Sequence, residues 1–111
     1  MYVLATVIVI ILIIVIMYNY DMRKLTRNID KNSRLIETKS GVIECSISGE
    51  GIPVIISHGG AGGYDQGQIT GKVHLDDRFK VIAVSRFGHL RTPLPEDCSA
   101  IKQADAYAGL L

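Results

Sequence analysis

The chain has 111 residues, and its 12 Lys and Arg side chains nearly balance its 11 Asp and Glu side chains. This balance, without a basic face, argues against nucleic acid as a partner. Cys45 and Cys98 lie far apart and lack the C-x-x-C or Cys/His spacing of a redox or metal motif. We interpret both as packing residues that a cytoplasmic environment keeps reduced.

The first segment, Met1–Tyr18, carries no charged side chain. At about 1.5 Å per residue, a helix over this segment is about 27 Å long, close to the hydrocarbon thickness of a bilayer. Tyr18 and Tyr20 fall where an interfacial aromatic belt would lie. A signal peptide would need a basic start and a small-x-small cleavage site, and a core helix would need a polar face. We therefore predict a transmembrane anchor over residues 1–20.

Basic side chains follow the apolar segment closely. The positive-inside rule then places the rest of the chain in the cytoplasm, as a single-pass membrane protein. The alternative is a solvated linker without a role in topology. We predict a juxtamembrane basic linker over residues 21–32, and the cations concerned are Arg23, Lys24, Arg27, Lys31 and Arg34.

Residues 33–111 have the pattern of a mixed α/β domain. Residues 34–38 and 42–48 form a predicted hairpin about a turn at residues 39–41. In its second strand, Val42, Cys45 and Ile47 mix with Glu44, Ser46 and Ser48, which predicts a sheet with one face in water.

Two further strands are predicted to be buried on both faces, as in a parallel sheet: Val54–Ser57 and Phe79–Val84. A weak helix lies between them, within residues 59–71. A last helix is expected from residues 96–97 onward, with an apolar stripe at helical spacing formed by Ile101, Ala104, Tyr107, Ala108 and Leu111. The order of hairpin, strand, helix, strand and helix indicates the opening of an α/β sheet.

A glycine-rich loop follows the first buried strand at His58-Gly59-Gly60. Gly59–Gly63 does not complete the dinucleotide fingerprint G-x-G-x-x-G, and Gly67–Lys72 does not complete a P-loop. The three histidines, His58, His74 and His89, lack metal-ligand spacing. The residues therefore indicate no metal and no organic cofactor.

The strand-end His58 has three interpretations. It can orient the loop, together with Gly59, by hydrogen bonding, or it can pack there as a structural residue. A catalytic base is the least favoured, because no serine or cysteine partner is evident in the sequence.

Three stretches together resemble the α/β-hydrolase family. Gly49–Gly60 (GEGIPVIISHGG) is similar to its third strand and oxyanion loop, Arg78–Pro93 to its fourth strand and following loop, and Gln103–Leu111 to the helix before the nucleophile strand. The match covers residues 34–111 in the family's order. It implies the N-terminal portion of an α/β-hydrolase sheet, an antiparallel hairpin followed by parallel strands, preceded by one transmembrane helix.

The resemblance implies that the backbone N–H of Gly60 is one oxyanion-hole donor. No G-x-S-x-G nucleophile elbow occurs among these residues, and the family's acid and catalytic His would follow that elbow. Ser57 and Ser85 do not lie in such an elbow. We therefore expect the N-terminal fragment of a serine hydrolase for ester or amide bonds, with a small acyl substrate when complete, that is inactive and folds poorly alone.

The alternative function is a non-catalytic membrane-tethered protein, either a binding protein or a remnant. Such a protein would use the sheet edge expected at residues 79–84 to accept a strand from a partner.

Overall fold

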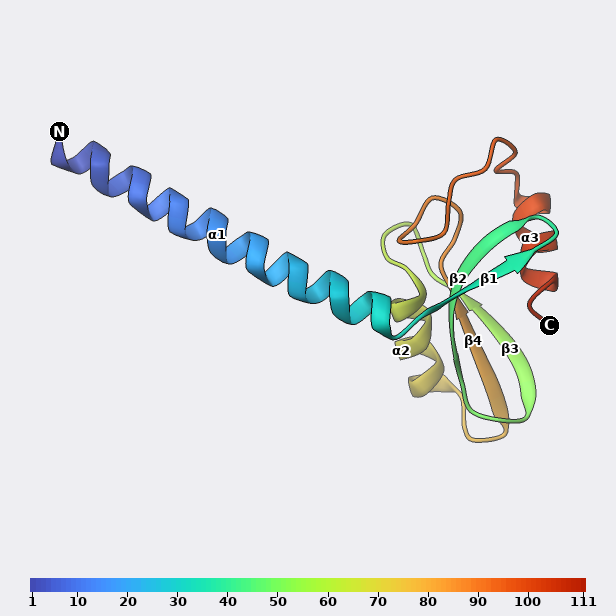
Figure 1. Ribbon diagram of the computed structural model, residues 1–111. Helices are drawn as coiled ribbons and strands as arrows, with labels where there is room; N and C mark the ends of the chain where they lie inside the picture. The colour runs from blue at the N-terminus through green and yellow to red at the C-terminus, as the bar shows by residue number, and fades with distance from the viewer. The chain divides into compact units, whose positions relative to one another are not determined.

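The computed structural model describes residues 1–111, which divide into two units, Met1–Lys31 and Asn32–Leu111. The first unit is a single helix, α1 (Tyr2–Lys31), shown in Figure 1. By length and composition, α1 is sufficient to cross a membrane. The segment 21–31, expected as a linker, forms the last turns of this helix.

The second unit is built on a four-stranded sheet with the order β1-β2-β4-β3. The first three strands in that order pair antiparallel, and β3 pairs parallel with β4, so the predicted mixed sheet is confirmed. The elements are β1 (Arg34–Thr38), β2 (Gly41–Ser48), β3 (Ile52–Ser57), α2 (Tyr64–His74), β4 (Phe79–Val84) and α3 (Ala100–Ala108).

Helices cover both faces of the sheet (Figure 1). On the α3 face, Ala106 packs into a cluster formed by Ile43, Cys45, Ile82 and Val84. On the other face, α2 approaches so closely that a Cβ on its Gly71 would lie 2.8 Å from Val81 Cγ1. The glycines of α2 therefore permit the close contact between helix and sheet.

The edges of the sheet differ from expectation. β4 lies between β2 and β3, so the prediction of an open edge at residues 79–84 is wrong. The open edges belong to β1 and β3, each of which pairs with a strand on one side only. The side chains of β3 are consequently only half-buried or exposed, whereas both faces were expected to be buried.

The predicted solvent-facing side of β2 is also wrong. Glu44 is 0% exposed and Ser46 is 4% exposed, because α2 and the loop after β4 cover this face. Hydrogen bonds, rather than water, satisfy these polar groups.

Of the apolar stripe predicted for α3, only Tyr107 packs against the core. Ile101 and Leu111 are 75% and 73% exposed, and the other residues that pack are Ala106 and Leu110. The helix begins after Ser99, whose Oγ accepts the Lys102 N–H, a few residues later than expected. Cys45 is buried as predicted, but Cys98 is exposed and packs against no core.

Candidate active site

The carboxyl ends of β3 and β4 lie side by side at one end of the sheet. We call this end the carboxyl edge, as distinct from the unpaired sides of the outer strands. The two strands are parallel, and Ser57 lies opposite Val84 in their register. The residues that follow, His58 after β3 and Ser85 after β4, therefore start two adjacent loops. In open α/β sheets this edge is where ligands bind.

Both ring nitrogens of His58 are engaged by backbone groups. Nδ1 lies 2.7 Å from the Gly59 carbonyl oxygen, and the Arg86 N–H donates to Nε2 over 3.0 Å. Since a backbone N–H can only donate, the proton of the neutral ring must be on Nδ1, where it is donated to Gly59. This geometry supports the loop-orienting role. It also leaves no ring nitrogen free to act as a catalytic base.

The surroundings of His58 favour the neutral imidazole. The side chain is 6% exposed, and burial lowers its pKa from the ordinary value of 6.5. The neighbouring charges of His89 and Arg86 lower the pKa further, while the hydrogen bond to Gly59 and the charge of Asp65 oppose the shift. The neutral tautomer that the hydrogen bonds require is therefore also the form that burial favours.

A second histidine, His89, joins the loop after β4 to the glycine loop. Its ring lies edge-on to His58, with 4.7 Å between the ring centroids and 64° between the planes. Its Nε2 lies 3.4 Å from the Gly60 carbonyl oxygen, and its Nδ1 lies 3.2 Å from that of Phe87. This pair was not predictable from the sequence, because the two residues come from different loops.

These contacts fix the direction of the Gly60 N–H. The chain contains no cis peptide bond, so the Gly59 carbonyl and the Gly60 N–H point in opposite directions across one rigid plane. Holding the carbonyl against His58 therefore turns the N–H away from it. Gly60 is exposed, and its N–H donates to no group within the 111 residues. A Cβ built on Gly60 has no neighbour within 4 Å, so the space beside it is open.

A buried carboxylate, Glu44, supports the loop after β4. Glu44 of β2 accepts hydrogen bonds from Ser33 Oγ (2.6 Å), Ser85 Oγ (3.1 Å) and both the backbone N–H and Nε of Arg91 (3.0 and 2.9 Å). Burial raises the pKa of Glu44, but these hydrogen bonds outweigh it and hold the pKa below its ordinary value. Glu44 is therefore the anion of a buried ion pair with Arg91.

Ser85 extends this network to the start of α2. Its Oγ donates to Glu44 and accepts the Tyr64 N–H over 3.1 Å. Thr92 closes the network, because its Oγ1 accepts the Glu44 N–H and donates to the Ser85 carbonyl. Ser85 is thus held in a structural network, which agrees with its position outside a nucleophile elbow.

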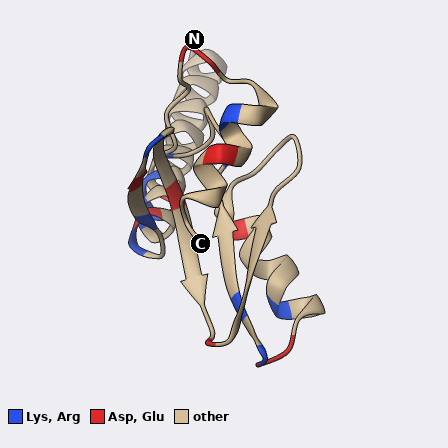
Figure 2. Cartoon of the chain, turned by 90° about the vertical axis from the view of Figure 1, so that its right-hand side faces the viewer, with Lys and Arg blue, Asp and Glu red and all other residues tan.

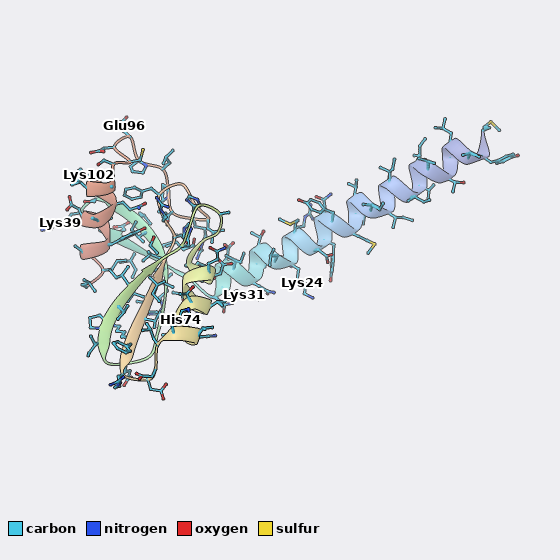
Figure 3. The ribbon with its side chains drawn as sticks, turned by 180° about the vertical axis from the view of Figure 1, so that it is seen from behind. Lys24, Lys31, Lys39, His74, Glu96 and Lys102 are labelled. Atoms are coloured by element: carbon cyan, nitrogen blue, oxygen red, sulfur yellow. The ribbon has the colours of Figure 1, made fainter.

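The third histidine is apart from this edge. His74 is exposed at the far end of α2, as Figure 3 shows. The chain contains no group of three or more His, Cys, Asp or Glu placed to hold a metal ion. One further polar atom is unusual: the buried hydroxyl of Tyr107, on α3, has no hydrogen-bond partner.

Taken together, the sheet and the glycine loop at its carboxyl edge define a hydrolase-type α/β unit. No family model matches the chain, and no curated protein matches it in sequence. Two solved structures do match its fold. An α/β hydrolase fold protein from Nakamurella multipartita is 33% identical, with a TM-score of 0.65 over 70% of this chain and 27% of that one.

The second is an epoxide hydrolase from an endophytic Streptomyces, which is 18% identical, with a TM-score of 0.60 over 70% of this chain and 24% of that one. The chain therefore spans about a quarter of the length of each of these proteins. The resemblance to the α/β-hydrolase family is confirmed, and this chain carries part of the α/β-hydrolase fold.

Proposed function

We propose that this chain is the N-terminal part of a membrane-anchored α/β hydrolase and supplies its oxyanion loop. The observation that carries the proposal is the unpartnered Gly60 N–H at the carboxyl edge of the sheet. Its direction is set by the hydrogen bond between His58 and the Gly59 carbonyl. An open backbone donor at this place is suited to the negative oxygen of a tetrahedral intermediate.

In this mechanism, the group that Gly60 contributes is its backbone N–H. Its N–H donates to the carbonyl oxygen of the acyl substrate as that oxygen becomes negative, and such a donor contributes about 3 kcal/mol to the transition state. A serine nucleophile, its base and an acid complete the reaction, and the second donor is the backbone N–H after the nucleophile. We assign these groups to residues outside the 111, because Ser85 is bound to Glu44 and Tyr64.

The proposed location follows from α1. Its apolar residues suit a bilayer, and its cations lie at the end that leads to the second unit. By the positive-inside rule, the α/β unit lies on the cytoplasmic side of the membrane. The proposed partners are thus the membrane, through residues 1–20, and a small acyl substrate; nucleic acid is not among them.

The alternative function is a membrane-tethered binding protein without catalysis. The open outer edge of β3 favours it, since an unpaired edge can accept a strand from another chain. A protein of this kind would melt cooperatively and stay monodisperse as 111 residues. Aggregation of the purified chain would favour the hydrolase fragment, whose sheet lacks its next strand.

The direct test is the transcript beyond the Leu111 codon, translated in all frames. The hydrolase proposal expects an apolar strand and G-x-S-x-G within about 20 residues, in frame or after a shift. A product that includes this motif should hydrolyse p-nitrophenyl esters, and the 111-residue chain should not exceed a heat-inactivated control. A stop codon with no such motif in any frame, or esterase activity of the 111 residues alone, would contradict the proposal.

A further inference from the structure

The last turns of α1 carry cations on one side of the helix. The basic face is defined as Arg23, Lys24, Arg27 and Lys31. Arg27 lies three or four residues from each of the other three, which places all four on one side of an α-helix. They line a single groove along α1 together with Tyr20 and Asn28. Figure 2 shows the charged residues of α1 gathered toward one end, and Figure 3 shows Lys24 and Lys31 there.

The basic face carries unbalanced charge. All four side chains are exposed, and none of them forms an ion pair within the chain. At 100° per residue, Asp21 and Asp30 lie to either side of the basic face rather than within it. Met22 and Leu25 lie on the opposite side, and both are exposed. This segment of α1 is therefore amphipathic, with one cationic and one apolar side.

We propose that the basic face binds the headgroups of anionic phospholipids in the membrane that α1 spans. The inference rests on the anchoring part of the proposed function, and not on catalysis. With a rise of about 1.5 Å per residue, Arg23 lies about 8 Å and Arg27 about 14 Å beyond Tyr18, the end of the apolar segment. Headgroup layers are about 5–8 Å thick, and charge attraction extends about 8 Å further at physiological salt.

The chemistry favours lipid over another polyanion. The cations continue directly from an apolar segment that has the length of a bilayer, so the membrane surface is the anion nearest to them. The whole chain carries a net charge of only +1, which gives no extended field for nucleic acid. Clusters of Lys and Arg immediately beyond a transmembrane helix are typical sites for acidic lipids.

The chain offers a clean reporter because it contains no Trp. Tyr20→Trp places a single fluorophore beside the basic face. The full chain is reconstituted in phosphatidylcholine vesicles with a minor fraction of phosphatidylglycerol, and one lipid at a time carries brominated acyl chains that quench Trp. Quenching then gives the association of phosphatidylglycerol with the protein relative to phosphatidylcholine. We expect a preference of about fivefold or more, which falls as NaCl is added.

The charge-removing variant is Lys24→Gln/Arg27→Gln/Lys31→Gln. It should abolish most of the preference, whereas Lys39→Gln/Lys72→Gln/Lys102→Gln, which removes the same charge from exposed positions of the second unit, should retain it. Equal quenching by both lipids, or an equal loss in both variants, would overturn the proposal. Quenching by neither lipid would show that α1 is outside the bilayer and would overturn it as well. A preference that excess RNA or acidic peptide removes would assign the basic face to that competitor instead. Ester hydrolysis is not measured, so the outcome is independent of the catalytic part of the proposed function.

Discussion

At the residue scale, the buried side chain of His58 determines the direction in which the Gly60 N–H points. Its two hydrogen bonds, to the Gly59 carbonyl and from the Arg86 N–H, join the loops after β3 and β4. From the sequence, His58 could orient the loop or simply pack beside it, and its hydrogen bonds support the first interpretation. The sequence could not predict His89 as the partner, since that contact depends on the path of a different loop.

The first prediction concerns the stability that His58 provides. His58→Ala removes both hydrogen bonds and leaves the Arg86 N–H without an acceptor, so the free energy of unfolding should fall by about 1–3 kcal/mol. Urea unfolding of the full chain in detergent, followed by circular dichroism, measures this loss. The exposed His74→Ala is the matched control and should stay within about 0.5 kcal/mol of wild type. Equal stability of the two variants would contradict the role of His58.

The second prediction is a pH dependence. The folded pKa of His58 lies below 6.5, so the unfolded chain binds more protons and stability falls as the pH drops below 6.5 toward the folded value. Glu44 acts in the same direction at lower pH: its folded pKa lies below 4.5, so its contribution is complete above 4.5 and is lost below it. Unfolding midpoints measured from pH 7 downward should therefore decline in two stages. The first stage should be absent in His58→Ala, and its persistence there would assign it to another group.

The third prediction tests the oxyanion donor in a product that includes the nucleophile. Gly60→Ala retains the N–H, and its Cβ enters open space, so ester hydrolysis should change little. Gly60→Pro removes the N–H and should lower kcat by about 100-fold or more, with a smaller effect on KM. Similar rates for the two variants would show that another donor holds the oxyanion.

At the element scale, Glu44 shows where sequence patterns fail. Alternation along β2 predicted that its polar side chains face water, because a period of two cannot distinguish water from a buried ion pair. The partners of Glu44 are Ser33, Ser85 and Arg91, all far from it in sequence. The order and type of the elements were predictable from local patterns. The buried face of α3 was not predictable in this way, because the helix has more apolar residues than the sheet can cover.

The fourth prediction concerns this buried ion pair. Glu44→Gln removes the charge that pairs with Arg91 Nε and weakens the hydrogen bonds between β2 and the loop after β4, so stability should fall by about 2–4 kcal/mol. Arg91→Met should cost less when combined with Glu44→Gln than when introduced alone, because the two residues act as one unit. The exposed pair of Asp76 and Arg78 supplies the control, and Asp76→Asn should leave the unfolding midpoint unchanged. Additive effects at Glu44 and Arg91 would contradict their coupling.

At the scale of the whole molecule, the sheet is asymmetric. Both outer strands have an unpaired edge, but one side ends in the antiparallel hairpin of β1 and β2, and the other ends in β3, which pairs parallel with β4. Ile52 on β3 is 63% exposed, and such an edge is a template for association. The sequence predicted an open edge but assigned it to the wrong strand, because strand order depends on which parallel neighbour the chain crosses to.

The fifth prediction follows from this edge. The full chain in detergent should associate as its concentration rises, and Ile52→Lys should shift association to higher concentration by adding charge to the edge strand. Light scattering measures the association. Lys102→Gln, on α3 and away from β3, is the control for a general effect of charge. A wild-type chain that stays monodisperse would instead favour the binding-protein alternative.

His58 sets the direction of the Gly60 N–H through the peptide group that joins Gly59 to Gly60, and this affects which loop residues can change during evolution. The direction of the Gly60 N–H is set by His58, which precedes the loop, and no side chain within Gly59–Gly62 is needed to set it. Gly59 and Gly60, beside which a Cβ meets no neighbour within 4 Å, are therefore free to change in size and polarity, provided that each keeps its N–H; Gly62 is not, because its φ is +137° and a Cβ there would lie 2.5 Å from Gln66. The side chains of this loop can thus vary while the direction of the Gly60 N–H stays the same, so the shape of the loop surface and the direction of its donor can evolve separately.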